Sequence, residues 1–124
     1  MSEDIGDSEL KAELERKHFA RAALVAASLG VEEEELRELQ LEAIWQMSAE
    51  FRNAPGTKSL SEKYGFSKKE VDEFLRARAE QKRKAGEHKV LEPCYDQGTG
   101  RYLDFDEWEQ RLIRNWDKLS LSRH

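Results

Sequence analysis

Apolar residues recur every three or four positions along the first third of the chain, which is the spacing of amphipathic helices. The first such stretch follows Ser8, is interrupted at His18 and ends at Gly30. Glycine adopts the left-handed conformation that ends many helices, so Gly30 is expected to be a C-terminal cap. The residues before this stretch are acidic and polar, and we expect residues 1–7 to be a disordered leader.

A second helix is predicted to begin near Glu32, where four consecutive glutamates favour the positive end of the helix dipole. Its expected buried stripe is Leu36, Leu39, Ala43, Met47 and Phe51. The run Asn53-Ala54-Pro55-Gly56 is rich in helix-breaking residues and is expected to stop this helix. The sequence therefore predicts an acidic helix pair over residues 8–53.

The middle of the chain predicts two helices joined by a tight turn. A short helix over about residues 59–64 ends at Gly65, and Ser67 begins a longer helix with Glu70 completing a capping box. The inward positions of the longer helix are expected to be Val71, Phe74, Leu75 and Ala79. Together these elements form a predicted unit over residues 57–86.

After His88 the periodicity changes to that of a small β-hairpin over residues 88–103. Its arms are expected at 90–95 and 101–103, on either side of a five-residue loop, and Pro93 restricts the first arm to an edge strand or a bulge.

The C-terminal stretch predicts an amphipathic helix over residues 104–119, capped by Asp104. Its apolar positions are Phe105, Trp108, Leu112, Trp116 and Leu119. The expected fold is therefore one mainly α domain over residues 8–124. It has about five helices, a tri-helical unit and a short hairpin before the last helix.

Composition narrows the class of protein further. A chain of 124 residues fits a single domain. Its longest nearly apolar run, residues 22–29, is far shorter than the roughly 20 residues of a membrane-spanning helix, so no membrane association is expected. One cysteine, Cys94, excludes an internal disulfide and favours a reducing compartment. The first ten residues lack the pattern of a targeting signal, and we expect a cytoplasmic protein.

Charge is distributed unevenly along the chain. Residues 1–55 hold 13 acids and 6 bases, a net charge of −7, whereas residues 57–90 hold 10 bases and 6 acids, a net charge of +4. Residues 91–124 return to a net charge of −2, with 7 acids and 5 bases. A cationic segment between two acidic ones is a candidate for contact with an anionic partner.

The segment from Leu60 to Leu75 resembles the helix-turn-helix of bacterial DNA-binding proteins. Ser61 is small enough for close helix contact, Gly65 provides the turn, and Phe66 fills the gap between the helices. The resemblance covers residues 60–75 only, and the hairpin that follows is similar to the wing of a winged helix. The resemblance implies a small bacterial-type nucleic-acid-binding regulatory protein.

In that family the outward positions of the second helix enter the major groove of DNA. Carried over to this chain, with the basic residues at the end of the helix, the candidate nucleic-acid-binding residues are Ser67, Lys68, Lys69, Arg76, Lys82 and Arg83. Asp72 and Glu73, on the same helix, depart from the family's pattern because carboxylates repel phosphates.

A second interpretation needs no nucleic acid. Glycine followed by an apolar residue is what any tight helix–helix turn requires, and the pattern of residues 60–74 recurs over residues 25–39. Either the chain contains a weak duplication or the pattern recurs at every sharp helical turn. In this alternative the protein is an interaction module or adaptor with a protein partner. In either interpretation, the acidic helix pair either covers the tri-helical unit or forms a dimer surface.

No pattern of catalytic or metal-binding residues accompanies these elements. The region from Asp96 to Trp108 lacks oxygen ligands at the positions that a calcium loop needs. For His88 and Cys94 as a nucleophile–base pair, neither an orienting carboxylate nor an oxyanion loop is apparent. We expect no enzymatic activity, no metal and no cofactor.

Overall fold

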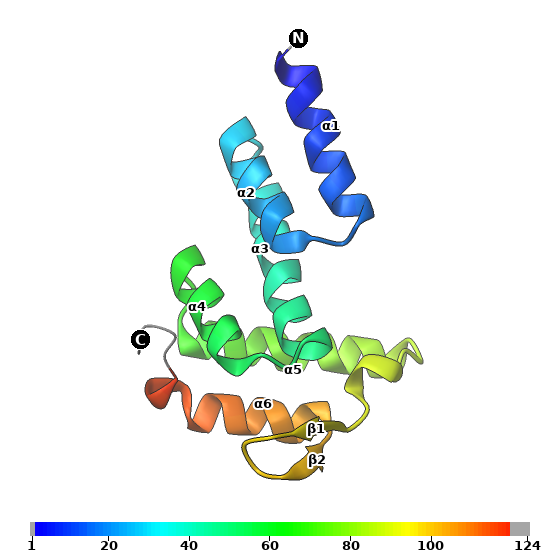
Figure 1. Cartoon of the computed structure of the whole chain (residues 1–124), viewed down its shortest axis with the longest axis vertical. Helices are drawn as coiled ribbons and strands as arrows, with labels where there is room; N and C mark the ends of the chain where they lie inside the picture. Colours follow the sequence, from blue (N-terminus) through cyan, green and yellow to red (C-terminus); the bar gives the residue numbers. More distant parts are fainter. Residues whose placement is uncertain (1, 120–124) are drawn as a thin grey trace. The chain divides into compact units, whose positions relative to one another are not determined.

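The computed structural model describes the backbone of residues 2–119 and the side chains of residues 8–119 (Figure 1). The prediction of a mainly α chain with a hairpin before the last helix is confirmed. The α-helices in the described residues are α1 (Ser2–Glu15), α2 (Phe19–Leu29), α3 (Glu33–Trp45), α4 (Ala54–Tyr64), α5 (Lys68–Lys84) and α6 (Phe105–Arg114). The strands are β1 (Cys94–Asp96) and β2 (Arg101–Leu103), and shorter helical turns cover Gln46–Glu50, Lys89–Leu91 and Trp116–Lys118.

The chain divides into two compact units between Gln46 and Met47, where the sequence predicted a single domain over residues 8–124. The division falls inside the predicted acidic helix pair, 8–53. It coincides with the start of a π-helical turn, Gln46–Glu50, which ends the regular α-helix α3.

The first unit contains α1, α2 and α3, and α2 packs against both of the others (Figure 1). Its buried positions on α2 are Ala22, Ala23 and Ala26. These small side chains allow neighbouring helices to approach closely. α1 begins at Ser2, so the leader that we expected to be disordered over residues 1–7 is helical from its second residue.

The turn between α1 and α2 confirms the interruption predicted at His18. Lys17 has a positive φ of 60°, which ends α1 although the residue is not a glycine. Glu13 is buried, and its carboxylate lies 2.9 Å from His18 Nδ1 and accepts a hydrogen bond from Arg21 Nε at 3.1 Å. These contacts, led by that with His18, lower the pKa of Glu13.

The turn between α2 and α3 also follows the prediction. Gly30 has a φ of 72° and caps α2, and the amide of Val31 donates to the carbonyl of Ala26 at 3.3 Å. This pair of features is a Schellman-type helix end, which uses the left-handed freedom of glycine.

The run Asn53-Ala54-Pro55-Gly56, predicted to stop a helix, instead starts α4. The side chain of Asn53 accepts a hydrogen bond from the amide of Gly56 at 2.8 Å. Proline is tolerated in a first helical turn because its missing amide proton has no partner there. α4 therefore begins at Ala54 rather than near Ser59.

The buried stripe predicted for the second helix is wrong at Phe51, whose side chain is 59% exposed. A π-helical turn has more residues per turn than an α-helix, so the positions after Gln46 rotate away from the expected face. In this turn the buried residues are Ser48 and Ala49.

The core of the second unit lies where α5 packs against α6. Its buried apolar residues include Val71, Leu75 and Ala79 of α5 and Phe105, Trp108 and Leu112 of α6, with Trp116 after them. The amphipathic pattern and the cap at Asp104 that were predicted for the last helix are confirmed, but α6 ends at Arg114 and not at residue 119. Asp104 and Glu107 accept hydrogen bonds from each other's backbone amides. Each large apolar side chain buried here stabilises the fold by about 1.5–3 kcal/mol.

The hairpin is shorter than predicted. Lys89–Leu91 forms a helical turn, and β1 begins only at Cys94, directly after Pro93. Proline has no amide proton for a strand ladder, which accounts for this start. The strands are antiparallel, and Tyr95 is paired with Tyr102.

Candidate functional site

The α4–α5 corner has the local packing that the helix-turn-helix resemblance implies. Gly65 caps α4 with a φ of 83°, and the amide of Phe66 donates to the carbonyl of Ser61 at 2.8 Å. Ser61 is fully buried and Phe66 is 6% exposed. Ser67 and Glu70 form the predicted capping box at the start of α5. The corner is therefore a well-packed turn, whether or not it contacts a ligand.

The basic side chains at the start of α5 are exposed. Lys68 and Lys69 lie in the first turn of the helix, and neither forms an ion pair within the described part of the chain. The hydroxyl of Ser67 accepts a hydrogen bond from the backbone amide of Glu70 at 3.1 Å, so this side chain caps α5.

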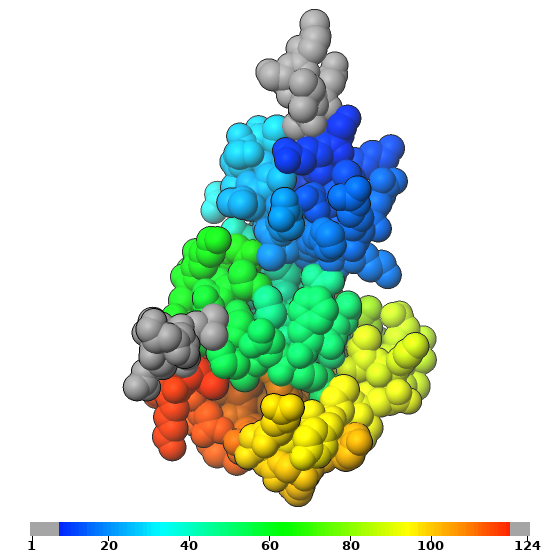
Figure 2. Space-filling view, viewed as in Figure 1, coloured from blue at the N-terminus to red at the C-terminus, as the bar shows by residue number. Residues whose placement is uncertain are grey.

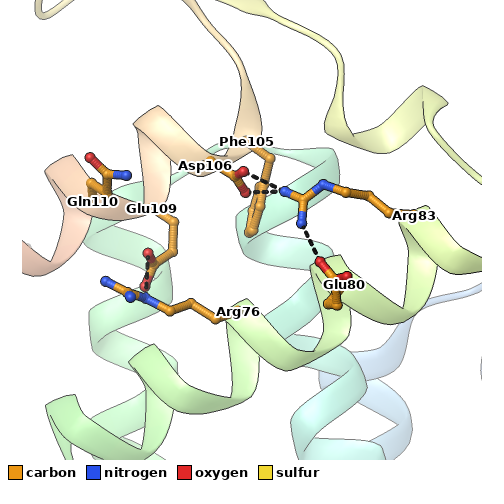
Figure 3. A pocket seen from close by; sticks show the side chains of 7 residues that line it. All are labelled: Arg76, Glu80, Arg83, Phe105, Asp106, Glu109 and Gln110. Carbon is orange, nitrogen blue, oxygen red and sulfur yellow. Dashed lines mark hydrogen bonds and ion pairs between the residues drawn. The ribbon is translucent and has the colours of Figure 1, made fainter.

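The other predicted nucleic-acid-binding residues are paired with carboxylates. Arg76 Nε lies 2.8 Å from Asp72 and 3.5 Å from Glu109, and Lys82 lies 3.2 Å from Glu87. Arg83 pairs with Glu80 at 2.9 Å and with Asp106 of α6 (Figure 3). The structure therefore does not gather the five basic residues of the predicted site into a single group of unpaired cations. DNA binding through them stays a prediction.

A cavity of about 260 Å³ lies between α5 and α6 (Figure 3). Its lining consists of Arg76, Glu80, Arg83, Phe105, Asp106, Glu109 and Gln110. Most of these side chains form the ion pairs described above, so the cavity is bordered by a charge network that connects the two helices.

Glu109 is the unusual member of this network. Its side chain is only 3% exposed, and its Oε2 atom has no hydrogen-bond partner. Burial, together with the adjacent carboxylate of Asp72, raises the pKa of Glu109 to about 8. The sequence held a signal for this site, because Glu109 falls on the same helical stripe as Phe105 and Leu112, where an apolar residue is expected.

Arg52 connects separate segments of the second unit. Its guanidinium donates to the backbone carbonyls of Ala49, Val90, Glu92 and Leu103 at 2.9–3.1 Å. Its carbon Cζ lies 5.5 Å from the centre of the Phe105 ring, a cation–π contact. Burial lowers the pKa of this arginine, although the group remains charged. No pattern in the sequence singled out Arg52, whose φ of 48° belongs to the left-handed region.

An exposed group of aromatic residues lies on and beside the hairpin, and we call it the aromatic surface: Phe51, Tyr95 and Tyr102. Tyr95 is 56% exposed and Tyr102 is 68% exposed, and their rings meet edge to face with centres 5.4 Å apart. Phe51 and Tyr95 both line a hollow of about 350 Å³, together with Trp108. Figure 2 shows the hairpin, in yellow, at the molecular surface.

The alternation of side chains along the strands could have predicted the exposure of the two tyrosines. Leu103 is 2% exposed, so its neighbour Tyr102 points to the opposite face of β2, where it meets its cross-strand partner Tyr95. The exposure of Phe51 had no such signal, because it depends on the π-helical turn before it.

The described residues contain no group of three or more side chains suited to hold a metal ion. Nor do they include a helix with the length and apolarity needed to cross a bilayer.

Comparison with protein families, with curated proteins and with solved structures finds no match for this chain.

Proposed function

We propose that this protein is a protein-interaction module that binds a polypeptide segment of a partner at its aromatic surface. The observation that carries the proposal is the exposed Tyr95–Tyr102 pair beside a hollow bordered by Phe51. These three rings are each more than half exposed, and folding of the chain alone leaves them in water.

Aromatic side chains are the residues that most often dominate the free energy of protein association. Tyrosine suits such a role because it offers a large apolar area with few rotatable bonds and keeps a polar hydroxyl. The hollow beside Tyr95, with Trp108 in its lining, offers space for one apolar side chain of a partner.

The surface is also held in place before any partner binds. Arg52 connects β2 and the segment before β1 to the end of the π-helical turn through four carbonyls. A preformed surface loses less conformational entropy on binding, which favours affinity.

The charge of the second unit favours a polypeptide over a polyanion as partner. Residues 47–124 hold 16 Lys or Arg and 14 Asp or Glu, so the unit is nearly neutral. Glu50 and Glu92 are exposed and lie within two residues of the hollow's lining residues Phe51 and Cys94. We therefore expect the bound segment to combine an apolar anchor with a neighbouring lysine or arginine.

The test is selection of peptides from a random displayed library against the full chain, followed by fluorescence anisotropy with the selected peptides. We expect peptides with an apolar anchor next to a basic residue, and at least tenfold weaker binding to Tyr95→Ala and Tyr102→Ala. Leu24→Ala is the matched control, because Leu24 is an exposed apolar residue (64%) of the first unit.

Three outcomes would overturn the proposal. These are the absence of any selected peptide, equal affinity of both tyrosine variants and the wild type, and a loss in Leu24→Ala as large as in the tyrosine variants. Binding of a single-stranded oligonucleotide that depends on the same tyrosines would assign the aromatic surface to base stacking instead.

Nucleic-acid binding through α5 is the second candidate function. It is favoured by the exposure of Lys68 and Lys69 at the N-terminal end of a helix that follows the Gly65 turn, since this end of a recognition helix contacts bases and phosphates. The remaining cations of the predicted site are already paired, which leaves these two lysines as its expected phosphate contacts.

This candidate is tested by binding to random duplex DNA at about 50 mM salt, where phosphate contacts are strongest. Binding that is weakened by Lys68→Ala and Lys69→Ala, but not by Lys84→Ala at the other end of α5, would support it. The absence of binding at this salt concentration would exclude it.

A further inference from the structure

One carboxyl group of α5 and one of α6 contact the same arginine side chain. Asp72 and Glu109, which we call the carboxyl pair, both reach the Nε atom of Arg76, at 2.8 Å and 3.5 Å respectively. One guanidinium therefore serves two acids. The other carboxyl oxygen of Glu109, Oε2, is buried and has no hydrogen-bond partner in the described residues.

The three side chains of this ion-pair group differ in their exposure to solvent. The Arg76 side chain is 64% exposed and that of Asp72 is 26% exposed, whereas that of Glu109 is 3% exposed. A charged carboxylate at the buried end would pay a large desolvation cost and would also repel Asp72. Two ionised carboxylates cannot hydrogen-bond to each other, because neither has a proton to donate.

We propose that Glu109 carries a proton that it shares with Asp72, and that loss of this proton weakens the packing of α6 on α5. The proton supplies the donor that the pair otherwise lacks. Asp72 keeps its negative charge and its contact with Arg76, so the pair as a whole stays neutralised.

The other groups around Glu109 do not replace this proton. Asp72 and Arg76 are the charged residues that act on Glu109 in the described part of the chain. Along the cavity, Arg83 is paired with Glu80 and Asp106. The β2 strand and the helical turns Lys89–Leu91 and Trp116–Lys118 also pack against α6. Their buried apolar residues are Leu103, Leu91 and Trp116.

The sign of the pH dependence follows from the raised pKa. Glu109 has an ordinary pKa of 4.5 when the chain is unfolded and about 8 when it is folded. The folded state therefore holds more protons than the unfolded state between these values, and the free energy of unfolding falls as pH rises through them. The stabilisation of the folded state by this proton is complete below pH 4.5 and is lost above about pH 8.

The experiment is urea unfolding of the full chain at pH 6 and pH 9, followed by tryptophan fluorescence. Trp108 and Trp116 are buried in the second unit and report on it. In the wild type, the unfolding equilibrium constant is expected to rise tenfold to a hundredfold, as an order of magnitude, between the two pH values.

Glu109→Gln is the decisive variant, because its amide can donate to Asp72 but does not titrate. We expect it to lose most of the difference between pH 6 and pH 9 and to be more stable than the wild type at pH 9. Asp72→Asn removes the facing charge and is expected to reduce the difference as well. Glu73→Gln, an exposed neighbour on α5, is the control and should keep the wild-type difference.

A wild-type difference retained in Glu109→Gln would overturn the inference. If that variant fails to fold, the carboxyl carbon of Glu109 is titrated by NMR in the wild-type chain instead. A midpoint near pH 8 is expected, and a midpoint below pH 6 would also overturn it.

Discussion

The α5–α6 contact and the β1–β2 hairpin belong to the same unit but distribute polar and apolar groups in opposite ways. In the helix contact, the carboxyl group of Glu109 is almost fully buried. On the hairpin, the rings of Tyr95 and Tyr102 are more than half exposed. In most proteins a buried acid and an exposed aromatic pair are both the less common arrangement.

The buried carboxyl and the exposed tyrosine pair indicate which residues of this chain have roles beyond stabilising the fold. A buried carboxyl costs stability unless it is neutralised, and an exposed tyrosine pair contributes little to folding. Neither arrangement is explained by the stability of the core, and we propose proton binding for the first and partner binding for the second. Substitutions can distinguish residues that stabilise the second unit from residues that proton binding or partner binding requires.

The largest effect is expected for Arg52→Met, which keeps the apolar stem but removes four hydrogen bonds to carbonyls. We expect the free energy of unfolding of the second unit to fall by about 3 kcal/mol. Urea unfolding followed by tryptophan fluorescence measures it. Arg101→Met, at an exposed position of the hairpin, should change it by less than about 0.5 kcal/mol. A similar loss in both variants would contradict the bridging role of Arg52.

A smaller effect is expected at the helix-turn-helix-like corner. Ser67→Ala removes the side chain that accepts the amide of Glu70 at the start of α5. Loss of such a cap costs about 1 kcal/mol. Thermal unfolding by circular dichroism measures the change, and Ser59→Ala, an exposed serine inside α4, is the control. An unchanged midpoint in Ser67→Ala would mean that the cap does not stabilise α5.

For Arg76→Gln, we expect a change in proton affinity rather than a large change in stability at neutral pH. Arg76 is the cation that lowers the pKa of Glu109, so its removal is expected to raise that pKa above about 8. The NMR titration of Glu109 described above provides the measurement. An unchanged or lower pKa would show that Arg76 does not act on the carboxyl pair.

The smallest effect on stability is expected on the aromatic surface. Tyr102→Ser removes one ring of an exposed pair, and the free energy of unfolding should change by less than about 1 kcal/mol. The same variant should lose peptide binding, measured by fluorescence anisotropy. A destabilisation as large as that of Arg52→Met would mean that the tyrosines serve the fold instead of a partner.

Several turns and helix starts were predicted correctly from residues that lie close together in the sequence. The turns at Gly30 and Gly65, the capping box at Ser67 and the cap at Asp104 were all predicted, because each depends on residues within a few positions. The Asn53 segment was misinterpreted for a related reason. The same residues that stop one helix can cap the next, and only the direction of the Asn53 side chain decides between them.

The candidate sites were harder to predict because they depend on contacts between distant segments. Asp72 stood out in the sequence only as a departure from the helix-turn-helix pattern, and its partner Glu109 lies 37 positions further along. The backbone carbonyls to which Arg52 donates hydrogen bonds belong to residues up to 51 positions away. No local pattern specifies such pairs.

The sequence by itself determined the helical class, the glycine turns, the capped starts of α5 and α6 and the position of the hairpin, since short-range periodicity and capping chemistry specify these features. Only the tertiary structure decided which cations are neutralised, which carboxyl is buried and which aromatic rings stay in water. The physical reason is that burial and charge pairing belong to the packed arrangement of several segments, whereas a helix or a turn is specified by its own neighbours.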